Sequence, residues 1–585
     1  MQSTEKRGFL QDALQSHIWD TKIKSANVTR TERLLGYMVG PFGVMLLQSI
    51  VNSYFNQYLT DVRGFTASKG LWIATFMVVF PIVSKIIDAI TNVLMAKVLD
   101  RTTCRQGKLR PWFILSLPII VLSIFMMFSV PNVGVRTQAV WVIVSYNLFY
   151  SVGYTMWYMA YEMSAALSTR NVKQRSGNSI TGQITKNIGT GMVSITFPLI
   201  LQGVCGIIGQ NLQIGYLTVM ATMCCIAVPL TFIQYFFTRE RITEERRNQF
   251  QDDPNKIQTK EERFGVQLRA CLKDKYWIMF ILLILIYQIL NALRSVSQVY
   301  YAGWVVHGNS YGEYAAIQAK FTMIAMAPMG PMLFVVVPLI KKFGRRKLII
   351  LGGLMAFAGA TAAFFSAGGN TLIVYLGTTL SGIGGMFYMY TMMSYLGDAI
   401  DHVEYTQHIR CEGMTAALVG FVHSLSNGIG LGLFNLGLMA FRYETPKQIG
   451  VLQNGVAQYA DQRGMAVTWI NFSYQGSIAL TGLLFFVLFL FFFNIDKIMP
   501  QVTRELEERK KAECAAMGID YIPSEELQRK ELVEQKAEAE RNRIAELKAH
   551  CEKKGLDFET ENQKYLAKQA RKHDSKRRHR THNPF

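Results

Sequence analysis

Long apolar runs alternate with short polar connectors through most of this chain. Each run holds about 20 residues or more, the length that an α-helix needs to cross a bilayer core of about 30 Å. The pattern therefore predicts an all-α membrane protein with twelve transmembrane helices. We place them at residues 34–60, 71–99, 111–130, 138–167, 179–202, 214–237, 277–303, 313–340, 348–367, 372–397, 413–441 and 466–493.

Charged residues concentrate outside these runs, and the connectors alternate in charge. The basic loops "DRTTCRQGKLR" and "KKFGRRK" follow the second and eighth spans, whereas "SAGGN" holds no charge. Basic connectors stay in the cytoplasm of membrane proteins. We therefore expect a multi-pass protein of the cell (plasma) membrane with both termini cytoplasmic.

A charged central stretch divides the predicted spans six and six, and each half places a basic loop after its second span. This organisation predicts two pseudo-symmetric six-helix bundles, followed by a charged helical tail. The expected boundaries are 1–33 for an N-terminal cytoplasmic segment, 34–238 and 277–494 for the two bundles, 239–276 for a cytoplasmic linker and 495–585 for a cytoplasmic tail.

The totals exclude several other classes of protein. The net charge of +20 over 585 residues is explained by basic cytoplasmic loops, and no domain-like basic fold indicates a nucleic-acid partner. The eight cysteines form no C-x-x-C pair, so neither a zinc site nor a disulfide framework is expected. No phosphate-binding G-x-x-x-x-G-K-[ST] loop is present, which argues against ATP-driven work. We expect neither an enzyme nor a cofactor.

Ionisable residues inside the predicted spans are the first candidates for chemistry. Such residues are costly in a bilayer and commonly line a pathway or form pairs. They are Lys85, Asp88, Glu162, Lys186, Arg294 and Lys320. Lys85 and Asp88 stand three residues apart, so they share a helix face. Two interpretations remain open at this point: a structural ion pair, or a role for Asp88 as a cation ligand or proton carrier.

The fourth predicted helix carries a second candidate surface. Tyr154, Tyr158, Tyr161 and Glu162 recur at helical spacing along it. Aromatic rings suit the apolar face of a sugar, and carboxylates suit its hydroxyls. An aromatic packing stripe is the alternative interpretation.

Three segments resemble the glycoside–pentoside–hexuronide:cation symporter family, typified by the melibiose permease. They are "YFNQYLTDVRGFT", "DAITNVLMAKVLDRTTCRQGKLRPW" and "GDAIDHVEYTQHIRCEG", and the resemblance covers roughly residues 31–494. This family belongs to the major facilitator superfamily, whose substrate site lies between the two halves near the midplane. The resemblance implies cation-coupled symport of a sugar-like solute by alternating access.

The resemblance also points to site residues, although several family acids are replaced. Asp88 stands at the first carboxylate of the second helix, and Asn92 occupies the place of the second. Tyr158 stands where the family has an aspartate, with Glu162 one turn further on. We therefore expect Asp88, Asn92 and Glu162 to couple the cation. With so few carboxylates, H⁺ is favoured over Na⁺, because Na⁺ wants several oxygen ligands.

The expected solute-binding residues combine these positions with the basic ones. Lys186 lies one turn beyond the place of a family arginine, and Asn427 replaces a family lysine. The predicted set is Lys85, Tyr154, Tyr158, Glu162, Lys186, Arg294, His423 and Asn427. The surplus of basic groups over acids admits an anionic solute such as a uronide. Other interpretations keep the fold but make the solute a lipid, or make the protein a non-transporting sensor.

Charges in the two loop motifs are expected to close the cytoplasmic side by pairing between the halves. This predicted cytoplasmic gate comprises Asp100, Arg101, Arg110, Asp398, Asp401, Glu404, Arg410 and Glu412.

The tail contains an internal repeat, with Lys511-Ala512-x-Cys514 recurring as Lys548-Ala549-x-Cys551. In each copy a glycine follows that can end a helix. The tail is therefore expected to form short helices on the cytoplasmic face. It is either a solvated tail without a further role, or it regulates the protein or binds anionic lipid or a cytoplasmic protein.

Overall fold

The computed structural model describes most of the chain in two compact units. The described residues are 19–25, 27–102, 104, 106–169, 172–208, 211–241, 243, 264–409, 411–451, 457–516, 533, 537, 540–541, 543–545, 547–552 and 555–567. One unit holds the chain up to Ile23 and Arg30–Arg509; the other holds Lys24–Thr29 and the tail from Lys510.

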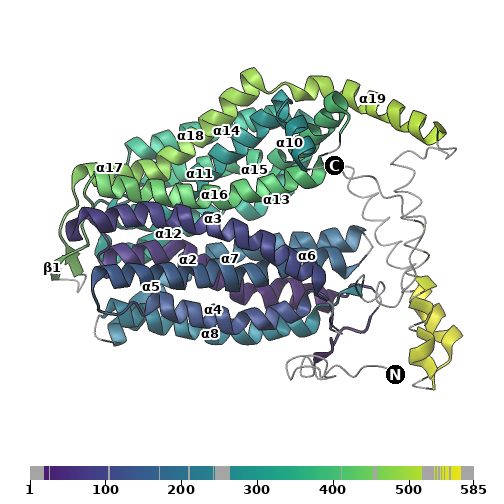
Figure 1. Cartoon of the computed structure of the whole chain (residues 1–585), viewed down its shortest axis with the longest axis horizontal. Helices are drawn as coiled ribbons and strands as arrows, with labels where there is room; N and C mark the ends of the chain where they lie inside the picture. The colour runs from purple at the N-terminus through teal and green to yellow at the C-terminus, as the bar shows by residue number, and fades with distance from the viewer. Residues whose placement is uncertain are drawn as a thin grey trace. The chain divides into compact units, whose positions relative to one another are not determined.

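The first unit is almost entirely helical (Figure 1). The N-terminal half comprises η2 (Glu32–Val39), α2 (Gly40–Gln57), η3 (Tyr58–Val62), η4 (Ala67–Lys69), α3 (Leu71–Arg101), α4 (Arg110–Phe128), α5 (Val135–Asn147), η5 (Leu148–Tyr154), α6 (Thr155–Ser168), α7 (Val172–Ile207) and α8 (Leu212–Phe237). The C-terminal half comprises α10 (Phe264–Cys271), α11 (Lys275–Trp304), η6 (Tyr311–Glu313), α12 (Tyr314–Met326), α13 (Met329–Phe343), α14 (Arg345–Phe365), α15 (Thr371–Gln407), α16 (Glu412–Ala440), α17 (Gly464–Asn471), η7 (Phe472–Gly476), α18 (Ser477–Val487), η8 (Leu488–Phe492) and α19 (Ile495–Ala516).

Ten helical segments in the described part of the chain are long and apolar enough to cross a membrane. Each overlaps one of the twelve predicted spans. The other two predicted spans are helical as well, but they are built from shorter pieces: 138–167 from α5, η5 and α6, and 313–340 from α12 and α13. The all-α membrane fold is therefore confirmed.

Helices of the C-terminal half approach each other closely at glycines. A Cβ atom on Gly352 of α14 would lie 2.6 Å from the carbonyl oxygen of Gly384 in α15. A Cβ atom on Gly353, on another face of α14, would lie 2.7 Å from the carbonyl oxygen of Gly482 in α18. Small residues at such positions let two helix backbones meet, as expected for helices packing in a membrane.

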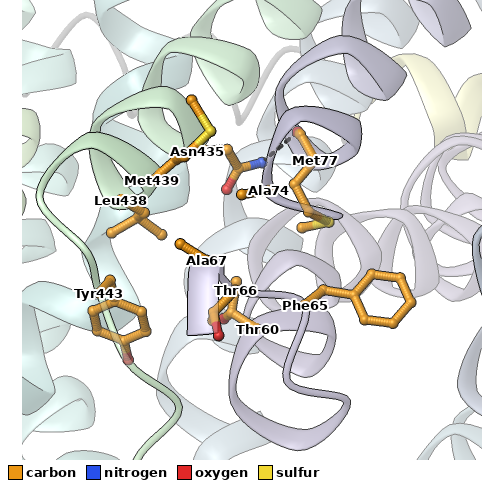
Figure 2. Close-up of a pocket in the computed structure, with 10 residues that line it drawn as sticks. All are labelled: Thr60, Phe65, Thr66, Ala67, Ala74, Met77, Asn435, Leu438, Met439 and Tyr443. Carbon is orange, nitrogen blue, oxygen red and sulfur yellow. Dashed lines mark hydrogen bonds between the residues drawn. The ribbon is translucent and has the colours of Figure 1, made fainter. Parts of the chain in front are cut away.

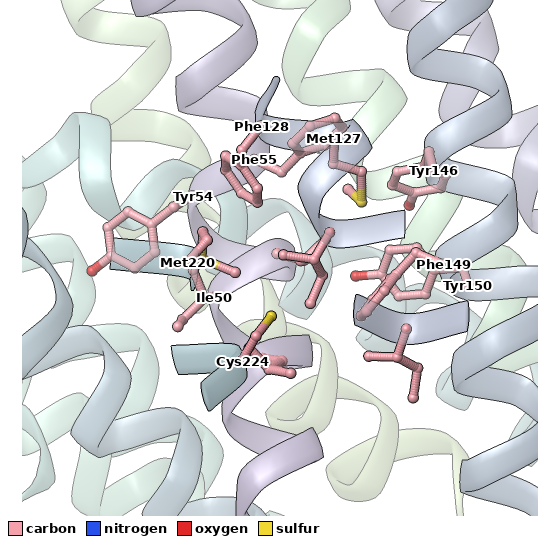
Figure 3. Packing of buried hydrophobic residues seen from close by; sticks show 14 of the residues in the cluster. Ile50, Tyr54, Phe55, Met127, Phe128, Tyr146, Phe149, Tyr150, Met220 and Cys224 are labelled. Carbon is pink, nitrogen blue, oxygen red and sulfur yellow. The ribbon is translucent and has the colours of Figure 1, made fainter. Parts of the chain in front are cut away.

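Aromatic and aliphatic side chains fill the core of the N-terminal half (Figure 3). Phe55 of α2 packs against Phe128, with ring centroids 5.7 Å apart, and against Tyr146 of α5 at 6.0 Å. Met220 and Cys224 of α8 pack in the same cluster. The packing fixes α2 among α4, α5 and α8, and so orients the polar face of α2 toward the other half.

A small hairpin that the sequence did not predict lies between α16 and α17. Its strands, β1 (Gln448–Val451) and β2 (Ala457–Tyr459), pair antiparallel. We call this end of the first unit the hairpin end. The opposite end carries the basic connectors after α3 and α13, and we call it the basic end (Figure 1).

The tail forms helical pieces within the described part of the second unit. In the second copy of the repeat, Gly555 has a φ of 65° just after the helix that contains Cys551. The Asp557 carboxylate then accepts from the backbone N–H of Thr560 and caps the next helix. The turn expected at this glycine is thus present. In the first copy, residues 517–521 lie outside the described residues.

Candidate functional site

A polar cluster around Asp88 lies where the two halves meet. Asp88 is on α3 and is 8 % exposed. Its Oδ1 accepts from the Thr155 hydroxyl at 3.2 Å, and its Oδ2 accepts from the Ser424 hydroxyl at 3.3 Å. Thr155 also lies 3.0 Å from the Asn92 Oδ1. Since Ser424 belongs to α16, the carboxylate joins the two halves through its own oxygens.

Lys85 forms the basic side of the same cluster. Its Nζ lies 3.4 Å from the Asp88 Oδ2 and 3.8 Å from the centre of the Tyr150 ring. A Cβ on Gly428 of α16 would contact the Lys85 stem at 3.0 Å, so this glycine leaves room for the lysine. The ammonium group is held between a carboxylate and an aromatic face, both of which favour a cation.

Aromatic side chains of η5 and α6 form the next surface. Tyr154 and Tyr158 stack with ring centroids 5.3 Å apart, and the Lys186 ammonium of α7 lies 5.6 Å from the Tyr158 ring. Glu162 is exposed one turn along α6, beside Tyr158. The structure thus brings together Tyr158, Glu162 and Lys186, three of the predicted solute-binding residues. Their role in binding a solute stays a prediction.

The C-terminal half contributes two separate groups. His423 of α16 is exposed, and its Nδ1 lies 2.8 Å from the Gln288 amide nitrogen of α11. Asn427 donates to the His423 carbonyl one turn back. Arg294 lies further along α11, with its guanidinium 5.7 Å from the Tyr474 ring. In the described residues no carboxylate lies within ion-pair distance of Arg294.

Two of the predicted cytoplasmic gate residues, Arg110 and Asp398, make contacts within their own halves. Arg110 donates to the carbonyl oxygens of Gln106 and Tyr235, in the N-terminal half. Asp398 binds Arg345, which also reaches Asp496, in the C-terminal half. Asp401 and Glu404 follow Asp398 on α15.

Four other gate positions are not described at the side-chain level. Arg410 lies outside the described residues. The structure describes only the backbone of Asp100, Arg101 and Glu412. Pairing of the gate charges between the halves therefore stays a prediction.

Two acids that the sequence reasoning missed organise the basic end. Glu240 follows α8, and its carboxylate accepts from the backbone N–H groups of Lys108, Leu109 and Arg110. Burial raises the pKa of Glu240, and these three bonds oppose that effect. No local sequence pattern could have identified Glu240 as a partner of this loop, because it lies some 130 residues away from it in the sequence.

Asp274 is the second acid, and it joins the beginning of α11 to the end of α15. Its carboxylate accepts from the backbone N–H groups of Tyr276 and Trp277 and contacts the His402 Nδ1 at 2.5 Å. Burial raises the pKa of Asp274, but these hydrogen bonds outweigh burial, and the net pKa lies below its usual value.

Two contacts of the Asp88 cluster were also missed. Thr155 and Ser424 stand next to the predicted residues Tyr154 and His423, and each is a polar residue in an apolar helix. A hydroxyl in an apolar helix can indicate a contact with another helix. It is a weak indication, because hydroxyls in membrane helices often bond to the backbone of their own helix.

Comparison with known proteins identifies the family. A profile described as MFS/sugar transport protein matches residues 36–497. The chain belongs to the MFS/sugar transport protein family. Among relatives of this family, the isoprimeverose transporter of Lactiplantibacillus pentosus is 24 % identical over 498 residues, covering 84 % of this chain and 94 % of that protein. The glucuronide carrier protein homolog of Escherichia coli K12 is 20 % identical, covering 82 % and 96 %.

Solved structures support the same fold. A bacterial homolog of the human lysosomal transporter Spinster superposes with a TM-score of 0.54 at 12 % identity, covering 81 % of this chain and 99 % of that chain. At this identity the likeness concerns the fold alone. The family and its named relatives are transporters and symporters, so the chain is a secondary transporter of the multi-pass membrane type and not an enzyme.

Proposed function

We propose that this protein is a proton-coupled symporter of a sugar-like solute, with Asp88 as the coupling carboxylate. The observation that carries the proposal is the position of Asp88. It is almost fully buried at the junction of the halves and touches α6 through Thr155 and α16 through Ser424. A proton that binds there changes contacts on both sides of the junction, which is what coupling to alternating access requires.

The donor set supports a proton over Na⁺. Within the described residues no group of three or more His, Cys, Asp or Glu side chains is arranged to hold a metal ion. Around Asp88 the further oxygens are an amide and two hydroxyls, and the Lys85 ammonium already neutralises the carboxylate. Na⁺ would have to displace that ammonium, whereas a proton needs only one carboxylate oxygen.

In this proposal Tyr154, Tyr158, Glu162 and Lys186 form the solute surface, and His423 and Asn427 of α16 contribute to it. Stacked tyrosines offer an apolar platform, and the flanking charged groups offer hydrogen bonds to hydroxyls. Relatives named for isoprimeverose and for a glucuronide support a glycoside, pentoside or hexuronide as the class of solute. By the positive-inside rule we orient the basic end toward the cytoplasm.

Uptake into proteoliposomes tests the proposal. Purified protein is assayed with a panel of labelled glycosides, pentosides and hexuronides under an imposed proton gradient or an imposed Na⁺ gradient. We expect accumulation above equilibrium with the proton gradient only, and simple equilibration in Asp88→Asn, which keeps a side chain of the same size. Asp461→Asn, at an exposed position near the hairpin, is the matched control and should accumulate solute normally.

Accumulation driven by Na⁺ alone would contradict the choice of ion. Unchanged accumulation in Asp88→Asn would contradict the role of Asp88. Equilibration of solute without any dependence on either gradient would contradict symport itself.

A charged solute is favoured by one specific observation. Arg294 has no carboxylate partner among the described residues, although a guanidinium inside a membrane helix is costly without one. An acidic group on the solute would supply that partner. A glucuronide should therefore compete for uptake better than the matching neutral glycoside, and Arg294→Gln should abolish this preference while keeping uptake of the neutral compound.

A further inference from the structure

Hydrogen bonds between the two halves gather at the hairpin end. Asp61 lies there, in η3 just after the first long helix. Its Oδ2 accepts from the Tyr311 hydroxyl at 2.5 Å, and its Oδ1 accepts from the Tyr443 hydroxyl at 3.1 Å. Both tyrosines belong to the C-terminal half. Within the described residues no lysine or arginine lies within ion-pair distance of Asp61, so hydroxyl groups alone hold this carboxylate across the junction.

A second layer of contacts surrounds Asp61. The Thr60 hydroxyl lies 2.8 Å from the Tyr300 hydroxyl, and the Asn56 amide donates to the same tyrosine at 3.0 Å. Asn435 of α16 donates to the Asn56 Oδ1 at 3.0 Å and to the Met77 carbonyl oxygen of α3 at 2.9 Å. These residues line or adjoin the small cavity drawn in Figure 2.

The hydroxyls of Tyr311 and Tyr443 act as neutral hydrogen-bond donors. Burial raises the pKa of both Tyr311 and Tyr443 well above the usual value, and the nearby Asp61 carboxylate raises each further. The phenols therefore stay protonated and donate. Hydrogen bonds to a charged acceptor are among the stronger ones in proteins, and a covered carboxylate that loses its donors is left without compensation.

We propose that Asp61, Tyr311 and Tyr443 form a latch that holds the hairpin end closed. In this role they are positioning residues for transport: they bind no solute and set the equilibrium between closed and open forms of this end. The inference goes beyond the coupling mechanism proposed above and depends on neither the solute nor the ion. Opening must separate Asp61 from both tyrosines, and the free energy of those bonds then enters the conformational equilibrium directly.

The rate at which a buried cysteine introduced near the latch reacts with a thiol reagent tests this inference. Met77 is 3 % exposed and lines the cavity on the side opposite Tyr443 (Figure 2), so Met77→Cys reports opening of the hairpin end. Purified protein in detergent is treated with a maleimide, and modification of the introduced reporter thiol is followed by peptide mass spectrometry. We expect Tyr311→Phe and Tyr443→Phe each to raise the labelling rate about tenfold.

Three controls separate latch opening from general loosening. Tyr58→Phe removes an equally buried hydroxyl whose bond, to the Phe128 carbonyl at 2.9 Å, stays within the N-terminal half, and it should leave the rate unchanged. The native Cys224 is buried in the core of that half and should stay unlabelled in every variant. Val451→Cys, exposed in the hairpin, should react at the same rate throughout.

A double substitution assigns the effect to Asp61. In an Asp61→Asn background the acceptor carries no charge, and Tyr311→Phe should then change the rate less than about threefold. The latch is contradicted if Tyr311→Phe and Tyr443→Phe label at the parental rate, if Tyr58→Phe accelerates labelling equally, or if Cys224 becomes reactive together with the reporter thiol. A full tenfold effect of Tyr311→Phe in the Asp61→Asn background would also contradict it.

Discussion

At the scale of single residues, the buried charges of Lys85 and Asp88 have partners on their own helix and on neighbouring helices. Lys85 and Asp88 were predictable as a pair because three residues separate them on one helix. The hydroxyl groups that complete the site were not, because Thr155 and Ser424 come from other helices, and Ser424 lies 336 residues from Asp88. Sequence periodicity gives the face on which a side chain lies, whereas contacts between helices depend on how the helices pack.

Thr155 offers a prediction at this scale. Its hydroxyl touches both Asp88 and Asn92, so Thr155→Val removes the link between the two acceptors while keeping side-chain volume. We expect proton-driven uptake in proteoliposomes to fall about tenfold, since a buried charged acceptor loses a donor. Thr231→Val is the control, because that buried hydroxyl bonds only the Ala227 carbonyl of its own helix among the described contacts. Equal losses in both variants would contradict a specific role for Thr155.

At the scale of elements, the loop after α3 is shaped by an acid from another helix. Gly107 has a φ of 121°, a conformation that L side chains rarely adopt. A Cβ there would lie 2.5 Å from a Glu240 carboxylate oxygen. Glu240 accepts from the N–H groups of Lys108 and Leu109, just before α4, and from that of Arg110, its first residue. The carboxylate therefore lies at the N-terminus of α4, where the helix dipole favours a negative charge. The glycine of the loop motif is thus required by Glu240.

Replacement of this glycine should loosen the basic end. Gly107→Ala forces either the loop or Glu240 to move, and we expect the midpoint of thermal unfolding to fall by several degrees, reflecting a loss of about 1–3 kcal/mol. Gly134→Ala is the matched control, because Gly134 has negative φ and a Cβ there meets no atom within 4 Å. A midpoint for Gly107→Ala equal to that of Gly134→Ala would show that Glu240 is not held rigidly.

The positions of the helices could be predicted from the sequence, because apolar runs of spanning length leave few alternatives. Their interruptions could not. The fourth span passes through the π-helical segment η5, and the eighth divides between α12 and α13. The hairpin of β1 and β2 was missed for a related reason: its strands are four and three residues long, too short for a clear period of two.

At the scale of the whole molecule, the sequence indicates two halves but not which end of the junction is closed. That property depends on pairs such as Asn56 and Asn435, which lie 379 residues apart. Local patterns carry no information about such distances. The hydrogen bonds between the halves at the hairpin end are the basis on which we propose that this end is the closed one.

Cross-linking gives a prediction at this scale. Asn56→Cys with Asn435→Cys places two thiols where the side chains now touch at 3.0 Å. A short bifunctional thiol reagent should join them and stop uptake in proteoliposomes, because the hairpin end can no longer open. Each single cysteine variant, treated in the same way, should keep its uptake. Undiminished uptake in the cross-linked double variant would mean that transport does not require these helices to separate.

The bond from Asn435 to Met77 has a mechanical consequence. Pro81 lies inside α3 and has no N–H group, so the carbonyl of Met77, four residues earlier, loses its partner within the helix. Asn435 of the opposite half supplies the missing donor. The carbonyl that Pro81 leaves without a partner in α3 is therefore satisfied by a side chain of α16. We therefore expect α3 to bend more easily at Pro81 once the halves separate and Asn435 no longer donates to Met77.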